Sequence, residues 1–330
     1  MPRFRRACPV NPKQCEIFLL GAPGLQLVNA IPSRYNLAMT RHPMDEIPVR
    51  QLRFQSGLGE GRNPLWSQSS PDFAMFINAM GIHIPHFERF LVSVMRVYRD
   101  ELQDEQLLDD LQAIIGQESH HAFNFLCWTR ELTKRYPEIA DLNRQAEKYF
   151  ARAIKNRSKK FQIGFTAGYE TFTFLGGMII LNRYKELMEH ADPVLRGLWV
   201  WHQVEEVEHG SVAFDFYQYF YSKQEWYRRL MVLYAFFHIA KETFLAYKLM
   251  VKGEGYRGTR KLKAWSFFWS FAFDLAWAAL PVLSSNYHPR KHPICNDEQN
   301  SIAVAWREYY AAGNKIETLT DDDMFKIRML

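Results

Sequence analysis

Residues 201–217, WHQVEEVEHGSVAFDFY, gather carboxylates and imidazoles directly before an apolar run. Glu206 and His209 are three positions apart, and on a helix this spacing places both side chains on one face. A buried carboxylate is unfavourable unless a positive partner compensates its charge. The segment therefore indicates either a solvated helix face or a pair of ligands for a metal ion.

The same pair of residue types occurs earlier in the chain. In QESHHAFNFLCW, Glu118 and His121 are again three apart. Two other segments each contain one glutamate among apolar neighbours, namely Glu88 in HFERFLVSVM and Glu170 in GYETFTFL. A single Glu-x-x-His is common on surface helices, but the order Glu, Glu-x-x-His, Glu, Glu-x-x-His is hard to obtain by chance. It is the pattern of a dinuclear metal site in the core of a helical bundle.

Four helices are needed to position these side chains, and apolar residues recur every three or four positions from about residue 73 onward. The periodicity predicts helices at about 87–99, 104–136, 142–184 and 193–221, with Gly176-Gly177 as a candidate break. We therefore predict an all-α fold in three parts. They are an irregular N-terminal arm at 1–72 with a strand-like stretch at 47–54, a four-helix bundle at 73–221, and additional helices with a polar tail at 222–330.

The composition suits a large globular core, with 48% hydrophobic and 15% aromatic residues. The four cysteines form no Cys-x-x-Cys pair, and no apolar core of signal-peptide length follows the basic N-terminus. A cytoplasmic location is expected. The net charge of +5 is modest and most basic residues are interspersed with acidic ones, so nucleic acid is not an expected partner.

Two apolar stretches, 230–250 and 264–283, flank a basic segment at 248–263. Three interpretations stay open: helices packed on the bundle, an anchor on a membrane surface, and a true membrane span. Charged residues interrupt both stretches, which disfavours a span. Peripheral membrane contact through 229–284 is therefore kept as an alternative to a purely cytoplasmic protein.

The overall arrangement resembles the ferritin-like di-iron carboxylate proteins over about 73–221. More closely, the segments FINAMGIHIPHFERF, IGQESHH and WHQVEEVEHGSVAFDFY look like the family of predicted metal-dependent hydrolases. The resemblance implies a ferritin-like four-helix bundle with six metal ligands: Glu88, Glu118, His121, Glu170, Glu206 and His209. His83 and His86, just before Glu88, depart from the expected pattern.

The donor types indicate which metal is expected. Four carboxylates and two imidazoles, with no thiolate nearby, favour two iron ions, with manganese, a mixed manganese–iron pair or zinc as alternatives. Four carboxylates also balance the charge of two divalent ions, so the positive partner of the acidic segment would be the metal pair.

Three further side chains are candidates for supporting the ligands. Glu205 precedes Glu206 and is turned toward a neighbouring helix, where it would accept a hydrogen bond from His121. Asp215 is the other candidate for that role. His202 lies four residues before Glu206 and is either a third imidazole ligand or a hydrogen-bonded core histidine.

These features favour an O₂-activating di-iron oxidase or oxygenase. Glu170 and Glu88 would bridge the ions or shift to open a coordination position. The expected partners are O₂, an apolar or aromatic small molecule and an electron-donor reductase. A homodimer of the chain is also expected. The apolar substrate would suit an aromatic lining, whose candidates are Phe123, Phe125, Phe172, Phe174 and Phe214.

The rival enzyme class is a metal-dependent hydrolase, in which a hydroxide bridging the metals attacks the substrate. Neither a serine or cysteine nucleophile motif nor a phosphate-binding loop is evident in the sequence, and the donor set is typical of O₂-activating sites. An iron store is a third interpretation, which the length of the chain disfavours.

Overall fold

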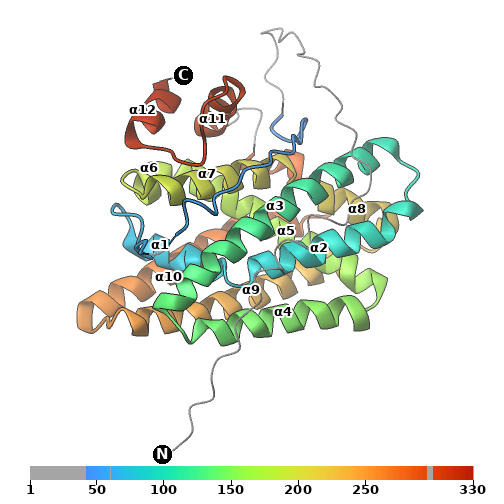
Figure 1. Cartoon of the computed structure of the whole chain (residues 1–330). Helices are drawn as coiled ribbons and strands as arrows, with labels where there is room; N and C mark the ends of the chain where they lie inside the picture. Colours follow the sequence, from blue (N-terminus) through green and yellow to red (C-terminus); the bar gives the residue numbers. More distant parts are fainter. Residues whose placement is uncertain (1–41, 60, 296–299, 330) are drawn as a thin grey trace, which may run out of the picture. The chain divides into compact units, whose positions relative to one another are not determined.

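The computed structural model describes residues 42–59, 61–295 and 300–329 (Figure 1). Within these ranges the regular elements are helices and no strand is formed, so the all-α prediction is confirmed. The part of the predicted arm at 1–41 lies outside the described residues. The predicted strand-like stretch at 47–54 is wrong, because its backbone bonds to side chains of a helix rather than to another strand. Asn124 accepts from the Phe54 amide at 2.9 Å and donates to the Leu52 carbonyl at 3.0 Å.

The helices alternate with short connections. In chain order they are α1 (Pro71–Met80), α2 (Ile84–Tyr98), α3 (Glu105–Arg135), α4 (Ile139–Asn156), α5 (Lys159–Asn182), α6 (Tyr184–Met188), α7 (Pro193–Glu208), α8 (Val212–Tyr221), α9 (Glu225–Gly253), α10 (Gly258–Ala278), α11 (Ser301–Ala311) and α12 (Asp321–Met329).

Capping side chains explain where several of these helices begin. Asp104 accepts from the amide of Leu107 at the start of α3, and Asp192 caps α7 in the same way. Ser158 is extended and caps α5, which splits the predicted helix at 142–184 near its middle. The predicted break at Gly176-Gly177 is wrong: α5 continues through both glycines. A Cβ at Gly177 would lie 3.1 Å from the carbonyl oxygen of Gln203, so this glycine permits close approach to α7.

The four helices that carry the predicted ligands contact one another in a closed ring. α2 packs on α3, α3 on α7, α7 on α5, and α5 on α2. The predicted helix at 193–221 is also divided, because α7 ends at Glu208 and α8 begins at Val212. The ring is the core that positions the site.

Helices α9 and α10 form an antiparallel hairpin, drawn in orange in Figure 1, and α9 packs along α5. The hydroxyl of Tyr247 donates to the carbonyl of Ala264 at 2.7 Å and joins the two helices. The contact between α5 and α9 is tight at Gly168, where an added Cβ would lie 2.6 Å from the carbonyl oxygen of Met231. The close packing of these backbones therefore depends on a glycine.

We expect Gly168→Ala to lower the free energy of unfolding by about 1–3 kcal/mol, because the methyl group would overlap rigid backbone atoms of α9. Gly176→Ala, in the same helix, is the matched control. Its nearest neighbour would be 4.0 Å away, so a gain of about 0.4–1 kcal/mol is expected from the reduced entropy of the unfolded chain. Chemical denaturation followed by circular dichroism measures both. Equal stability of the two variants would contradict this account of the packing.

Candidate metal centre

The ring of helices brings all six predicted ligands together in its interior. Their donor atoms form two groups, and within each group the atoms lie within 4.8 Å of one another. The first group contains Glu88, His121, His202 and Glu206, and the second contains Glu118, Glu170, Glu206 and His209. All of these side chains are buried. Glu206 belongs to both groups, so its carboxylate lies between two candidate metal positions.

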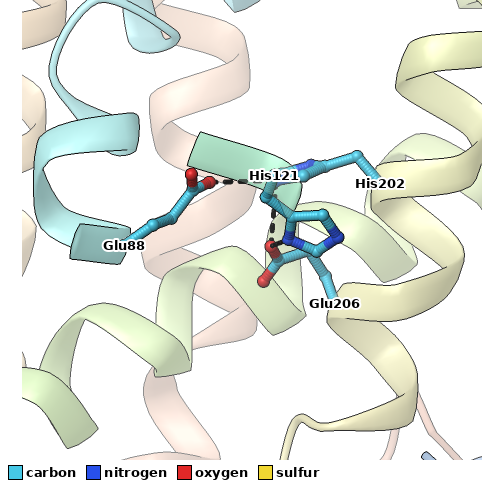
Figure 2. A group of neighbouring side chains, drawn as sticks. All are labelled: Glu88, His121, His202 and Glu206. Atoms are coloured by element: carbon cyan, nitrogen blue, oxygen red, sulfur yellow. Dashed lines mark hydrogen bonds and ion pairs between the residues drawn. The ribbon is translucent and has the colours of Figure 1, made fainter. Parts of the chain in front are cut away.

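In the first group, Glu88 approaches from α2, His121 from α3, and His202 and Glu206 from α7 (Figure 2). Nε2 of His202 lies 2.9 Å from Oε1 of Glu206 and 3.3 Å from Oε1 of Glu88. Nδ1 of His121 lies 3.5 Å from the same oxygen of Glu206. Two donors at right angles around one ion, each about 2.1 Å from it, would be about 3 Å apart. The spacing therefore suits one ion.

The second group converges on Nε2 of His209. This atom lies 3.1 Å from Oε1 of Glu118, 3.3 Å from Oε2 of Glu206 and 3.4 Å from Oε2 of Glu170. Glu206 thus directs Oε1 to the first group and Oε2 to the second. The two Glu-x-x-His motifs are not equivalent, because His121 offers Nδ1 whereas His209, which follows the last residue of α7, offers Nε2.

Several of these buried donor atoms have no hydrogen-bond partner within the described ranges. They are Oε2 of Glu88, both oxygens of Glu118, Nδ1 of His121, Oε2 of Glu170 and Oε1 of Glu206. Buried polar atoms are almost always satisfied, and an unsatisfied carboxylate is strongly unfavourable. Four of them have only ion-pair contacts with other members of the cluster. Donor atoms that converge on two points without hydrogen bonds are what bound cations would satisfy. The residues present therefore fit a pair of metal ions.

The electrostatics of the protein groups by themselves lead to the same conclusion. Burial raises the pKa of Glu88 and of Glu170 to about 8, since neither finds enough positive charge. Burial alone would also raise the pKa of Glu206, but His202 and His209 hold the pKa of its carboxyl well below the usual range. Burial alone would lower the pKa of His121, and its contacts with Glu118 and Glu205 raise it to about 9. Protons bound to these groups thus provide the positive charge that metal ions would otherwise provide.

Glu205 lies where the sequence predicted it, with Oε2 2.9 Å from Nε2 of His121. This contact orients the ring so that Nδ1 faces the first group. Asp215, the alternative for that role, instead contacts Nε2 of His288 at 3.0 Å near the surface. The two histidines before Glu88 lie outside both groups: His86 contacts Asn143 at 2.8 Å, and His83 is buried near Tyr169.

The structure also shows supporting residues that the sequence analysis did not assign. Arg50 contacts Glu205 at 2.9 Å and Glu208 at 2.8 Å, and both pairs are buried. Gln117 contacts Nδ1 of His209 at 2.8 Å and donates to Glu208 at 3.0 Å. The supporting role of Gln117 could have been predicted from its position beside Glu118. The role of Arg50 could not, because Arg50 lies in a segment whose sequence shows no helical pattern. Through Glu205 and Glu208 they connect Nε2 of His121 with Nδ1 of His209.

An apolar pocket of about 30 Å³ lies next to the first group. His202 and Gln203 are part of its lining, and Nε2 of Gln203 lies 2.8 Å from Nδ1 of His202. Of the aromatic residues expected at the substrate, Phe125 and Phe172 line this pocket. His202 thus faces the carboxylates with one nitrogen and lies beside an apolar space.

The protein should bind about two metal ions per chain. His121→Ala and His209→Ala should each remove about one ion, because each variant deletes a donor from one group while most helical contacts stay. Metal analysis after anaerobic reconstitution with Fe(II) or Mn(II) gives the stoichiometry, and circular dichroism reports the helicity. His288→Ala, which changes a histidine outside both groups, should retain both ions. Unchanged metal content in both ligand variants would refute the assignment.

Comparison with known proteins gives one match. A family model described as "Predicted metal-dependent hydrolase" matches residues 48–293, which is 246 of 330 residues. No curated protein and no solved structure matches. The ferritin-like part of the fold prediction and the identity of the metal therefore stay predictions. The matched range includes Arg50, both donor groups and the α9–α10 hairpin. A match to about three-quarters of its length shows that the chain belongs to the family of predicted metal-dependent hydrolases.

Proposed function

We propose that the protein is a hydrolase that uses two metal ions, one in each donor group. The observation that carries this proposal is Glu206, whose two oxygens face different groups and would hold two ions next to each other. A pair of divalent ions supplies Lewis acidity, which lowers the pKa of coordinated water and polarises a carbonyl or phosphoryl oxygen. The family description supports hydrolysis over other metal chemistry.

The charges of the centre support two divalent ions. Glu88, Glu118, Glu170 and Glu206 together carry four negative charges when ionised. The remaining acids are compensated by the protein itself, because Glu205 pairs with Arg50, and Glu208 pairs with Arg50 and Arg307. Two divalent ions would therefore leave the buried centre neutral, which avoids an uncompensated charge in the core.

Glu170 and Glu88 are the side chains best suited to move or to accept a proton. Each retains one oxygen without a hydrogen-bond partner, and the hydroxyl of Thr173 lies 3.4 Å from Oε1 of Glu170. Thr173 also lines the apolar pocket. A substrate in that pocket would have its apolar part among aromatic side chains and its scissile group near His202. The overall reaction adds water across the scissile bond and transfers one proton to the leaving group.

Oxidation with O₂ is a second candidate, and a specific observation favours it. The donors are four carboxylates and three imidazoles from four helices and the residue that follows α7, and neither group includes a thiolate. Such oxygen-rich sets suit iron and manganese, and bundles with this donor order hold di-iron or di-manganese centres. This activity would need the electron donor and O₂ expected from the sequence.

Metal substitution distinguishes the two candidates. If the protein is a hydrolase, the Zn(II) or Mn(II) form should cleave members of a panel of carboxylic esters, amides and phosphate esters without O₂ uptake. Glu206→Gln should reduce kcat at least about a hundredfold, since changes to residues that only support a ligand already cost about 10- to 100-fold. Asp322→Asn, at an exposed acid of α12, should leave kcat unchanged.

A different outcome of the same experiment would contradict the hydrolase proposal. Rapid O₂ consumption and a coloured product from the Fe(II) form, with no hydrolysis by any metal form, would overturn the hydrolase proposal in favour of oxidation. The measurements are an oxygen electrode, absorption spectroscopy and product analysis on the same preparations.

A further inference from the structure

The α9–α10 hairpin has an exposed apolar face. On α9, Trp226, Leu230, Leu233 and Phe237 recur at spacings of four, three and four, which aligns them along one side of the helix. On α10, Trp269, Phe273 and Trp277 recur every four residues, and Leu280 follows. Phe237 is 67% exposed and Trp277 is 66% exposed. We call these eight residues the outer face. An apolar surface of this kind marks an interaction site.

The opposite side of the same hairpin is apolar as well and packs on the helical ring. Met231, Ala235 and Ile239 of α9 are buried, as are Phe271 and Leu275 of α10. Both helices are long and apolar enough to cross a membrane, yet only 39% and 28% of their most apolar windows are buried in the protein. A helix that is apolar all round needs a second apolar environment. Because one side is already packed, that environment contacts the outer face only.

Positive charge at the turn of the hairpin identifies the environment. Lys248, Arg257, Lys261 and Lys263 are exposed and form no ion pair within the described residues. The acids of this region are already engaged: Glu254 contacts Arg135, and Asp274 contacts Arg183. An apolar face with tryptophans and adjacent lysines and arginines complements a lipid surface with anionic headgroups. A second copy of the chain would present the same positive charge and would not complement it.

Two narrow apolar cavities lie between this hairpin and the candidate metal centre and have lining residues in common. The first, of about 20 Å³, is lined by residues of α1, α5, α9 and α10, among them Ala240 and Ala272. Ala240 is three residues after Phe237, and Ala272 three after Trp269, so this cavity lies beside the outer face on both helices. Its lining shares Met80 and Phe172 with the pocket that reaches His202. Met80 thus lines both cavities, and its unbranched, flexible side chain would have to move aside for a chain of methylene groups to pass.

From these observations we infer that the outer face docks on an anionic membrane surface and that the substrate is an acyl ester drawn from the lipid. The acyl chain would follow the two cavities and bring the ester group to the first donor group. Water adds to the acyl carbon, the bond from that carbon to the alcohol oxygen breaks, and a proton passes to the alcohol. This substrate class rests on the proposed hydrolase function, whereas docking does not.

Docking is tested with full-length protein and vesicles of phosphatidylcholine, with or without phosphatidylserine. The wild type should sediment with the anionic vesicles at low salt and bind neutral vesicles more weakly. The double variant Phe237→Glu/Trp277→Glu should reduce binding at least about tenfold, because it places charge in the apolar layer. Lys261→Glu/Lys263→Glu should abolish the preference for anionic vesicles.

Controls separate a loss of docking from a loss of folding. Phe325→Glu replaces a side chain that is 66% exposed on α12, outside the outer face, and should bind vesicles like the wild type. All variants should keep their metal content and helicity, because none changes a donor residue or a buried side chain. Wild-type protein that fails to bind anionic vesicles, or outer-face variants that bind as well as the wild type, would overturn the inference. So would a wild-type dimer, seen by light scattering, that the outer-face double variant converts to a monomer.

Activity measurements on the same variants distinguish this inference from the hydrolase proposal. The Phe237→Glu/Trp277→Glu variant should lose hydrolysis of vesicle lipids but keep hydrolysis of a short, water-soluble ester. Hydrolysis of the soluble ester alone, by wild type that binds vesicles but leaves their lipids intact, would refute the substrate class. No hydrolysis of either substrate would refute the proposed function and leave the docking result standing.

Discussion

The burial of four carboxylates inside a ring of helices is the constraint on which the rest of the structure depends. Glu88, Glu118, Glu170 and Glu206 come from α2, α3, α5 and α7, and each side chain is almost completely enclosed. Their mutual repulsion and loss of hydration would oppose folding of the core. Protons and imidazoles compensate the cluster only in part, since several donor atoms have no hydrogen-bond partner among the residues that the structure describes. Cations at the two convergence points would supply the missing charge.

A second layer of charge holds this centre in place. Glu205 orients His121, Gln117 contacts His209, and Arg50 joins Glu205 to Glu208. The guanidinium of Arg50 also lies 5.1 Å from the centre of the Trp306 ring, so a residue of α11 covers it. The segment before α1 and the segment after α10 thus both contribute to the surroundings of the ligands. A division of the protein into an independent bundle and appended parts does not describe this centre well.

The helices and the donor positions could be predicted because both depend on local spacing. Apolar periodicity locates α3 and α7, and the Glu-x-x-His spacing locates the ligand pairs. Helix boundaries were less predictable: α4 ends at Asn156 and Ser158 caps the start of α5, inside the span that was predicted as one helix. Arg50 could not be predicted, since its role arises from contacts with residues more than 150 positions away. The orientation of His202 toward Glu88 likewise depends on how α7 is rotated relative to α2. The apolar pattern of one helix does not specify that rotation.

The sequence distance between Arg50 and its partners has a consequence for the order of folding. The salt bridges to Glu205 and Glu208 close loops of 155 and 158 residues, whereas the contacts that build each helix are local. Pairings between residues so far apart form slowly, because the chain must lose much conformational freedom before they stabilise it. During synthesis, Arg50 leaves the ribosome well before either of its partners exists. Helices α2 and α3 are therefore expected to pair first, and the imidazole of His121 acquires its fixed orientation only in the last stage of folding.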